Sequence, residues 1–200
     1  MLSKFKNNLT FYLFFTAILI FHQIVFQKFF PNSKGLLGHD YSQYIPNLIF
    51  GKIWFYNNFL SIPWFTPSFC CGIPFYADPQ STFYSIYQLI FILFDPVNSI
   101  KIIFFVLSFF SYIGMFFLIR KFGFSKYSSL LCACLFLFNG FFVYRAIAGP
   151  LISYILVPLY CFFLIKSFEN YKKKINYIYL VISSIFFAHF FHSGSGPVIL

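Results

Sequence analysis

Long apolar runs, most of them bounded by basic residues, restrict the possible folds of this sequence more than any other feature. Each is about 17 to 21 residues long, close to what a helix needs to cross the hydrocarbon core of a bilayer. The runs cover residues 10–30, 101–119, 127–144, 150–166 and 175–191. Because 60% of the 200 residues are hydrophobic and only 9% are charged, a soluble fold could not bury the apolar surface. The sequence predicts an all-α, polytopic transmembrane helix bundle and excludes a water-soluble enzyme, a disordered tail and a disulfide-rich secreted module.

The positions of the basic residues predict the orientation of the bundle. A further apolar run, 83–94, is too short, at about 12 residues, to span untilted. If it does not span, most of the 14 lysines and arginines, including Lys172–Lys174, fall in the cytoplasm; if it spans, most fall outside. The positive-inside rule favours the first arrangement, with five spans in the cytoplasmic (inner) membrane and a cytoplasmic N-terminus. Membrane orientation then explains the net charge of +10, so we expect the lipid bilayer as a partner and no nucleic acid.

This topology divides the chain into three parts. Residues 1–30 form an N-terminal anchor helix, 31–100 form a long outer loop, and 101–200 form four further transmembrane helices. The sequence ends on apolar residues just after an outer turn, which is the pattern we expect of a truncated bundle.

The predicted outer loop has structure of its own. Residues 41–59 place aromatic and apolar side chains on one face, which indicates a helix lying in the membrane interface. Pro46 predicts that the regular part of this helix begins near it. The Pro-rich aromatic stretch 62–74 predicts turns and extended pieces, and 83–94 predicts a second interfacial or re-entrant helix.

Several short motifs in and after this loop form a recognisable layout. They are Gly38-His39-Asp40-Tyr41, Pro63-Trp64-Phe65-Thr66-Pro67, Gly72-Ile73-Pro74, Ala77-Asp78-Pro79-Gln80, Phe138-Asn139-Gly140 and Arg145-Ala146-Ile147-Ala148-Gly149. With the anchor and interfacial helices, they resemble the N-terminal part of GT-C type glycosyltransferases, and in particular the YfhO-like bacterial membrane proteins of the cell envelope. The resemblance covers roughly residues 5–196. It implies an integral membrane glycosyltransferase, or its N-terminal fragment, that transfers a sugar from a polyprenyl-phosphate donor to an acceptor on the outer face.

Such a reaction requires a base for the acceptor hydroxyl, typically a carboxylate. By the resemblance, Asp40 matches the first-loop acid taken as the catalytic base. Alternatively, Asp40 followed three residues later by Gln43 is typical of a helix N-cap with a capping-box partner. Asp78 could be a second acid, a metal ligand or an acceptor anchor, and its Asp-Pro dipeptide is also a common turn starter. Asp95, which precedes Pro96, is expected to cap the next helix.

The departing lipid phosphate requires cationic or amide donors. Arg145 is the only arginine predicted on the outer side, and it suits a polyprenyl phosphate through bidentate contacts. The alternative for Arg145 is an interface anchor that touches lipid headgroups. His189 and His192 are spaced to share one helix face, where the resemblance implies a substrate-facing position.

No metal or other cofactor is indicated by these residues. Some members of the GT-C superfamily need a divalent cation held by acids, but the three outer acids here form no Asp-x-Asp motif. The pair His189-x-x-His192 could begin a metal site, yet no third ligand lies nearby in the sequence, which favours hydrogen bonding.

A non-catalytic membrane protein, such as a transporter or an assembly subunit, is the alternative function. Transport usually leaves polar or ionisable residues at mid-membrane depth. The predicted spans hold few of these, among them His22, Ser108, Ser153, Ser183 and Ser184. Because three of the four acids lie in the outer loop, the sequence favours work at the outer surface.

Overall fold

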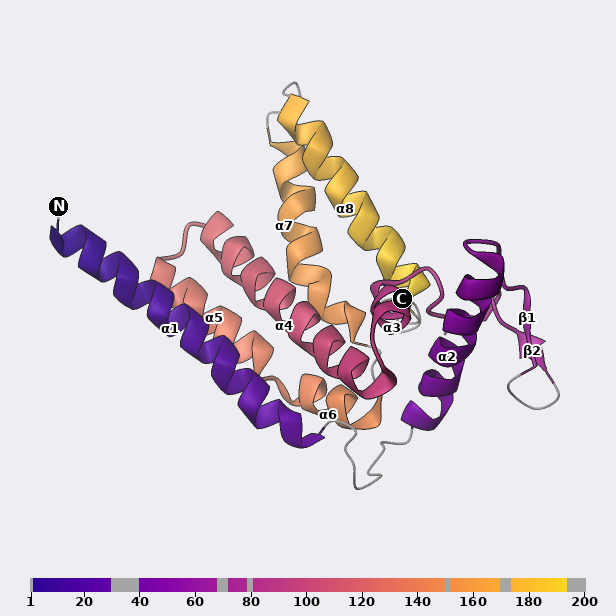
Figure 1. Ribbon diagram of the computed structural model, residues 1–200. Helices are drawn as coiled ribbons and strands as arrows, with labels where there is room; N and C mark the ends of the chain where they lie inside the picture. The colour runs from indigo at the N-terminus through magenta and orange to yellow at the C-terminus, as the bar shows by residue number, and fades with distance from the viewer. Residues whose placement is uncertain are drawn as a thin grey trace.

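The computed structural model describes residues 2–29, 40–67, 72–78, 81–149, 152–169 and 174–193, and these are mostly helical (Figure 1). The helices are α1 (Leu2–Phe26), α2 (Tyr41–Asn58), α3 (Ile86–Leu93), α4 (Pro96–Lys121), α5 (Lys126–Leu137), α6 (Gly140–Ala148), α7 (Val157–Phe168) and α8 (Lys174–His192). Two 3-10 turns, η1 (Gln27–Phe29) and η2 (Ser153–Leu156), follow α1 and precede α7. Two short antiparallel strands, β1 (Phe65–Thr66) and β2 (Ile73–Pro74), lie within the Pro-rich stretch.

Three helical segments are long and apolar enough to cross a membrane. They are Phe11–Phe29, Pro96–Lys121 and Ile175–His192, and they coincide with the first, second and last of the apolar runs in the sequence. Their outward faces carry large exposed apolar side chains, for example Phe14, Phe105 and Ile178. Such faces are stable against lipid and not against water.

The other two apolar runs are each interrupted. The run 127–144 breaks after α5, at Phe138 and Asn139, and the Asn139 side chain accepts a hydrogen bond of 2.8 Å from the Phe142 N–H at the start of α6. In the described part of the run 150–166, the 3-10 turn η2 precedes α7. With 12 residues each, α5 and α7 are about 18 Å long, shorter than the hydrocarbon core. The number of spans therefore stays a prediction.

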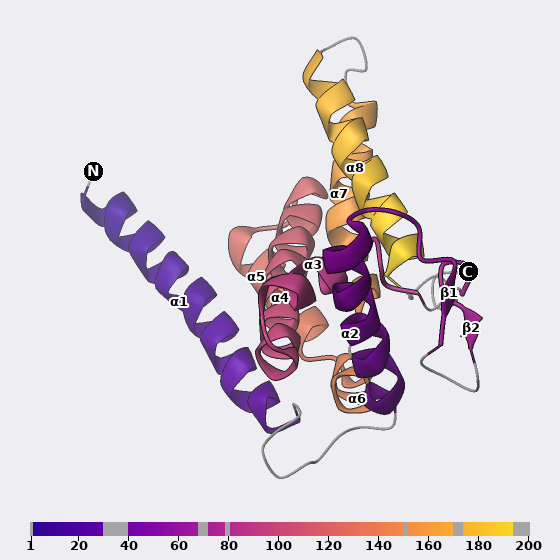
Figure 2. The same ribbon diagram turned by 45° about the vertical axis from the view of Figure 1, so that its right-hand side comes forward.

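Helix α4 is the centre of the bundle, with α1 and α5 on one side and α7 and α8 on the other (Figures 1 and 2). The α4–α7 crossing is close because of Gly114, where an added Cβ would meet the Cβ of Leu159 at 2.5 Å. One apolar core joins α1, α4 and α5 around Tyr112. A larger core brings together the segments that surround the candidate site, with Tyr87, Ile103 and Phe142 among its fully buried members.

The segment containing α2, α3 and the strands folds onto one end of the bundle. Gln88 on α3 donates a hydrogen bond of 3.0 Å to the Leu48 carbonyl of α2. Lys52 Nζ and the Tyr56 hydroxyl, both on α2, donate 3.1 Å bonds to the carbonyls of Phe94 and Ile92, where α3 ends. In Figure 1, α2 is inclined in the opposite sense to α1, α4 and α8, and the strands project away from the bundle. The expected helices over 41–59 and within 83–94 are both present, and α3, with 8 residues, is too short to span.

Two residues of this segment test the predicted helix boundaries. Asp95 caps α4 as expected, because its carboxylate accepts the Asn98 N–H at 3.1 Å. The expectation for Pro46 is wrong, because α2 begins at Tyr41 and Pro46 lies inside it. Proline has no N–H, so the helical hydrogen bond from residue 46 to the Ser42 carbonyl is missing. Tyr41, Tyr44 and Leu48 of α2 are buried, and the free energy gained by their burial outweighs the cost of the proline.

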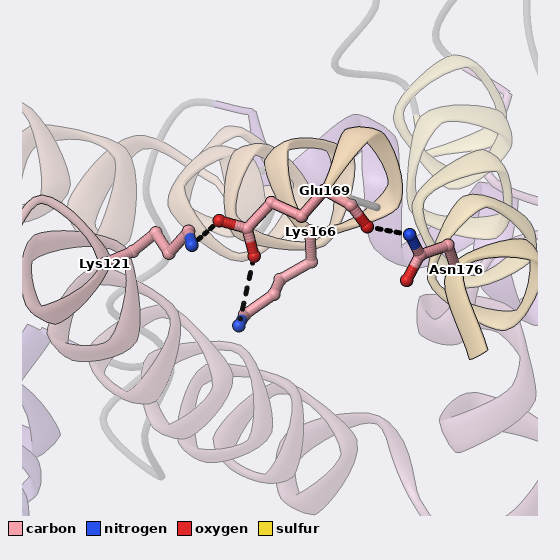
Figure 3. A network of polar contacts seen from close by, with 4 residues as sticks. All are labelled: Lys121, Lys166, Glu169 and Asn176. Carbon is pink, nitrogen blue, oxygen red and sulfur yellow. Dashed lines mark hydrogen bonds and ion pairs between the residues drawn. The ribbon is translucent and has the colours of Figure 1, made fainter. Parts of the chain in front are cut away.

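At the opposite end of the bundle, Glu169 joins three helices (Figure 3). Its carboxylate pairs with Lys121 at the end of α4 and, at 3.3 Å, with Lys166 of α7. Its backbone carbonyl accepts a hydrogen bond from the Asn176 side chain of α8. We call this region the Glu169 end, and the region of α2, α3 and α6 the Asp40 end.

Candidate functional site

Asp40 and Arg145, far apart in the sequence, meet at the Asp40 end. Asp40 is the N-cap residue of α2 and Arg145 lies in the last turn of α6, and both views show these two helix ends side by side. Arg145 Nη1 lies 3.6 Å from Asp40 Oδ2. The side chains are 15% and 33% exposed, respectively, so the carboxylate stays within reach of solvent while most of the arginine is covered. The arrangement joins the predicted base to the predicted phosphate ligand.

The capping alternative for Asp40 is not what the structure shows. Asp40 does occupy the N-cap position of α2, and its backbone carbonyl accepts the N–H groups of Gln43 and Tyr44 at 3.1 and 3.0 Å. Its carboxylate, however, makes no capping hydrogen bond. The side chain of Asp40 therefore does not cap α2.

Gly149 brings the end of α6 against Asp40. Its N–H donates a 2.9 Å hydrogen bond to the Arg145 carbonyl, which closes the last turn of α6. A Cβ added at Gly149 would lie 2.8 Å from the Asp40 Cβ and 3.5 Å from the ring of Tyr44. Residue 149 must therefore lack a side chain for Asp40 and Arg145 to approach each other as they do. The sequence motif Arg145–Gly149 contained this glycine, but its role was not predicted.

Two tyrosines of α2, Tyr41 and Tyr44, lie within electrostatic reach of the ion pair. Burial raises the pKa of Tyr41 and of Tyr44, and the positive charge of Arg145 opposes this in both. The negative charges of Asp40 and Asp78 raise the pKa of Tyr44 further, which brings Asp78 within electrostatic reach of the same cluster. Both hydroxyls stay protonated at neutral pH.

A buried hydroxyl network connects α3, η2 and α8. The Ile152 N–H donates to the Tyr87 hydroxyl at 3.0 Å, and the Tyr87 hydroxyl and Ser153 Oγ share a hydrogen bond of 2.8 Å in which either group can donate. Ser153 Oγ lies in turn 3.3 Å from His189 Nε2. Burial raises the pKa of Tyr87 to about 12, and the Ser153 hydrogen bond and the Arg145 charge oppose this rise. Tyr87 is therefore within electrostatic reach of Arg145, and its ring centroid lies 6.1 Å from that of His189.

His189 and His192 line a groove with a volume of about 500 Å³ between α3, α4, η2 and α8. The walls are apolar, and the histidines lie at the end of the groove where α8 terminates. The His192 ring contacts the edge or face of Tyr84 at a centroid distance of 5.9 Å. The apolar lining residues are Ile86, Leu107, Phe110, Leu156, Ile185, Phe186 and Ala188.

The five predicted site residues therefore fall into two neighbouring groups. Asp40 and Arg145 form the ion pair, with Asp78 in electrostatic reach of Tyr44 beside it. His189 and His192 belong to the groove, and Tyr87 and Ser153 connect the two groups. The motif residues Gly38, His39, Pro79 and Gln80 lie outside the described residues.

Among the described residues, no three His, Cys, Asp or Glu side chains are grouped as ligands for a metal ion. Sequence analysis missed Gly149, Tyr44, Tyr87 and Ser153. In the sequence they resemble ordinary small and aromatic residues of an apolar chain.

Comparison of the chain with protein-family models, with curated proteins and with solved structures found no match. The assignment of a function therefore depends on the geometry of the site and on the motifs in the sequence.

Proposed function

We propose that this chain is an integral membrane glycosyltransferase that transfers a sugar from a polyprenyl-phosphate donor to an acceptor on the outer face of the cytoplasmic membrane. The observation that carries the proposal is the pairing of Asp40 with Arg145 at the end of a helical bundle, next to an apolar groove. A carboxylate and a guanidinium held together are the two groups that this reaction needs, one for the acceptor and one for the leaving phosphate.

The distribution of charge supports five spans with the Asp40 end outside. Figure 1 shows the start of α1, the end of α4 and the start of α8 on the upper side, where Lys121 and Lys166 lie. The acids Asp40 and Asp95 belong to the opposite end. Because lysines and arginines are retained in the cytoplasm, the Glu169 end is cytoplasmic in this proposal.

The chemistry at the site is a displacement at the anomeric carbon of the donor sugar. Asp40 takes the proton of the acceptor hydroxyl as the new carbon–oxygen bond forms. The bond between the sugar and the phosphate breaks, and the phosphate oxygen leaves with the electron pair. Arg145 neutralises this charge.

The groove supports a donor that carries a hydrocarbon chain. Its walls on α4 and α8 belong to two of the helices long enough to cross a membrane, so a lipid chain in the bilayer has access to them. At the histidine end of the groove, His189 contacts Ser153, which is hydrogen-bonded to Tyr87. The positive charge of Arg145 opposes the rise in the pKa of Tyr87. A chain in the groove would therefore present its head group to the polar residues of the Asp40 end.

Turnover of a lipid-linked sugar tests this proposal. The full chain is reconstituted in vesicles with a panel of polyprenyl-phosphate sugars, and release of polyprenyl phosphate is followed by mass spectrometry. We expect release with the wild type and a loss of about 10²–10⁴-fold in Asp40→Asn, the usual effect of removing a general base. Asp95→Asn is the matched control, since asparagine also caps helices and the Asp95 carboxylate is engaged with Asn98 in capping α4. Equal turnover in Asp40→Asn would remove Asp40 from the mechanism.

A further inference from the structure

We infer that a groove between α1 and α4 binds an anionic phospholipid, with the headgroup at Lys101 and Gln23 and an acyl chain along the apolar part of the groove. Among the described residues, this groove shares no lining residue with the groove of His189 and His192. The inference therefore goes beyond the proposed function and does not depend on it.

The groove is formed by one face of each helix. Its lining residues are Ile20, Gln23 and Ile24 from α1 and Lys101, Ile102 and Phe105 from α4. Residues three and four positions apart lie on the same side of a helix, so each helix presents a continuous wall. The volume of about 430 Å³ is within the ~300–1,000 Å³ of ligand pockets, which is enough for part of a lipid.

The polar residues of the groove lie near one end of the bundle, and the apolar wall extends from them toward its middle. Helix α1 ends and α4 begins at the Asp40 end, so the two helices run in opposite directions (Figures 1 and 2). Gln23 lies about 5 Å before the end of α1, and Lys101 lies about 8 Å after the start of α4. Ile20 and Phe105 lie about one helical turn deeper. A phospholipid in a leaflet has the same order, with its headgroup at the surface and its acyl chains beneath.

Lys101 supplies a positive charge that no carboxylate of the described residues neutralises. The ion pairs of these residues belong to the Glu169 end and to Asp40 and Arg145. Lys101 lies within Pro96–Lys121, a segment apolar enough to cross a membrane, where an ammonium group needs water or an anion. The lining residues listed above include no acidic side chain. The charge of the groove therefore complements a headgroup with a net negative charge.

Gln23 contributes an uncharged donor to the same groove. Its Nε2 lies 3.3 Å from His22 Nδ1, and an amide nitrogen carries two hydrogens, so one hydrogen is available to a phosphate or ester oxygen. An ammonium group and an amide beside an apolar wall together suit the phosphate-ester region of a phospholipid.

A lysine near a helix end can instead extend its side chain to the membrane interface without binding a particular lipid. Lys101 would then attract anionic headgroups only as other surface lysines do. Lys28 in η1 is an exposed lysine where α1 ends, at the same end of the bundle, and it does not line the groove. A comparison of the two lysines therefore separates a bound lipid from a general attraction.

Native mass spectrometry of the full chain tests the inference. The protein in neutral detergent receives equal amounts of dioleoyl phosphatidylglycerol and dioleoyl phosphatidylcholine, which have identical acyl chains, and the ratio of the bound lipids is measured. We expect the wild type to prefer phosphatidylglycerol. Lys101→Gln should lower this preference about fivefold, which corresponds to ~1 kcal/mol. Lys28→Gln is the matched control and should keep the preference of the wild type.

A second pair of variants tests the apolar part of the groove. Ile20→Trp places a larger side chain at its inner end and should reduce binding of both lipids at least about fourfold, the effect of one CH₂ group losing its contact. Leu13→Trp is the control, because Leu13 and Ile20 are both 61% exposed and Leu13 does not line the groove. Both substitutions are on the exposed side of α1, so neither should unfold the chain.

Four results would overturn the inference, and none of them bears on sugar transfer. Equal binding of the two lipids to the wild type would mean that the groove does not select a charge. Equal effects of Lys101→Gln and Lys28→Gln would show a general attraction of surface lysines. Equal lipid binding by Ile20→Trp and Leu13→Trp would place the acyl chain elsewhere. A dimer in the same spectra that only Ile20→Trp removes would mean that a second copy of the chain fills the groove.

Discussion

Gly149 and Asp40 are in direct contact, and the contact leaves no room for a side chain at residue 149. The added Cβ of Gly149→Ala would lie 2.8 Å from the Asp40 Cβ, a separation that forces one of the two segments to move. We expect Gly149→Ala to lower sugar transfer by about 10- to 100-fold, because a displacement near 1 Å of a catalytic group has effects of this size.

The matched control for this substitution is Gly140→Ala, since nothing lies within 4 Å of a Cβ added there. Turnover measured on both variants in the same vesicles checks the prediction. Equal turnover of Gly149→Ala and Gly140→Ala would mean that the position of Asp40 does not matter.

Tyr87→Phe removes one hydroxyl from the centre of the buried network. The Ile152 N–H and Ser153 Oγ both lose their contact with it, and each buried group left without a partner costs about 1–3 kcal/mol. We expect a loss of unfolding free energy in that range, measured by denaturant titration in detergent. Tyr56→Phe also removes a hydroxyl hydrogen bond, but from an exposed side chain, and should lose less than about 1 kcal/mol. A loss in Tyr87→Phe no larger than in Tyr56→Phe would contradict the network.

The raised pKa of Tyr87 predicts a loss of stability at alkaline pH. Its pKa is about 12 in the folded protein, against 10.0 for an ordinary tyrosine. Above pH 10 the unfolded chain releases this proton while the folded chain retains it, so the stabilisation is complete below pH 10 and is lost as the pH rises toward 12. The unfolding free energy of the wild type should therefore fall more steeply between pH 10 and 12 than that of Tyr87→Phe. Identical slopes would show that Tyr87 titrates normally.

Glu169→Gln tests whether the opposite end of the bundle has a structural role only. The variant loses its ion pairs with Lys121 and Lys166, whose side chains and that of Glu169 are all partly exposed. Partly exposed pairs contribute about 0.2–1 kcal/mol each and are weakened by salt. We expect a small decrease in unfolding free energy that shrinks at high ionic strength, with sugar transfer unchanged. A large fall in turnover would connect the Glu169 end to the reaction.

The predicted orientation can be tested by labelling with a membrane-impermeant thiol reagent. In a chain whose native cysteines are replaced by serine, Asp78→Cys should react in intact cells. Lys126→Cys, at the start of α5, should react only after the membrane is opened. Reaction of Asp78→Cys only from the cytoplasmic side would overturn the outward-facing site and the proposed function with it.

The apolar runs and the caps were the predictable part of the fold, because each depends on local sequence. The runs at α1, α4 and α8, the cap at Asp95 and the helix over 41–59 follow from residue spacing and side-chain chemistry alone. The break at Asn139 also had a local signal, an Asn-Gly dipeptide within an apolar run. The apolar residues on both sides of it nevertheless predict one continuous span when hydrophobicity alone is considered. Pro46 misled for the opposite reason, since tertiary burial of the α2 face exceeds the local cost of a proline.

The sequence proposed candidate site residues but not their arrangement. Asp40 was proposed by the resemblance and Arg145 from its chemistry, whereas their contact depends on how α2 and α6 pack, which a single sequence does not encode locally. Tyr87 and Ser153 carried no signal, because a tyrosine in an apolar helix and a serine at a turn are common. Gly149 is informative only once its neighbour is known.

The unequal lengths of adjacent helices have a consequence for the surrounding lipid. Helix α4, with 26 residues, is about 39 Å long, whereas α5 beside it, with 12 residues, is about 18 Å long. In the proposed five-span arrangement both helices lie in the bilayer; one bilayer thickness cannot match both, and short helices are accommodated by local thinning of the bilayer. Lipids along α5 would therefore be drawn inward relative to those along α4. Their head groups would descend on the flank of the bundle where α5 turns into α6, the helix that carries Arg145.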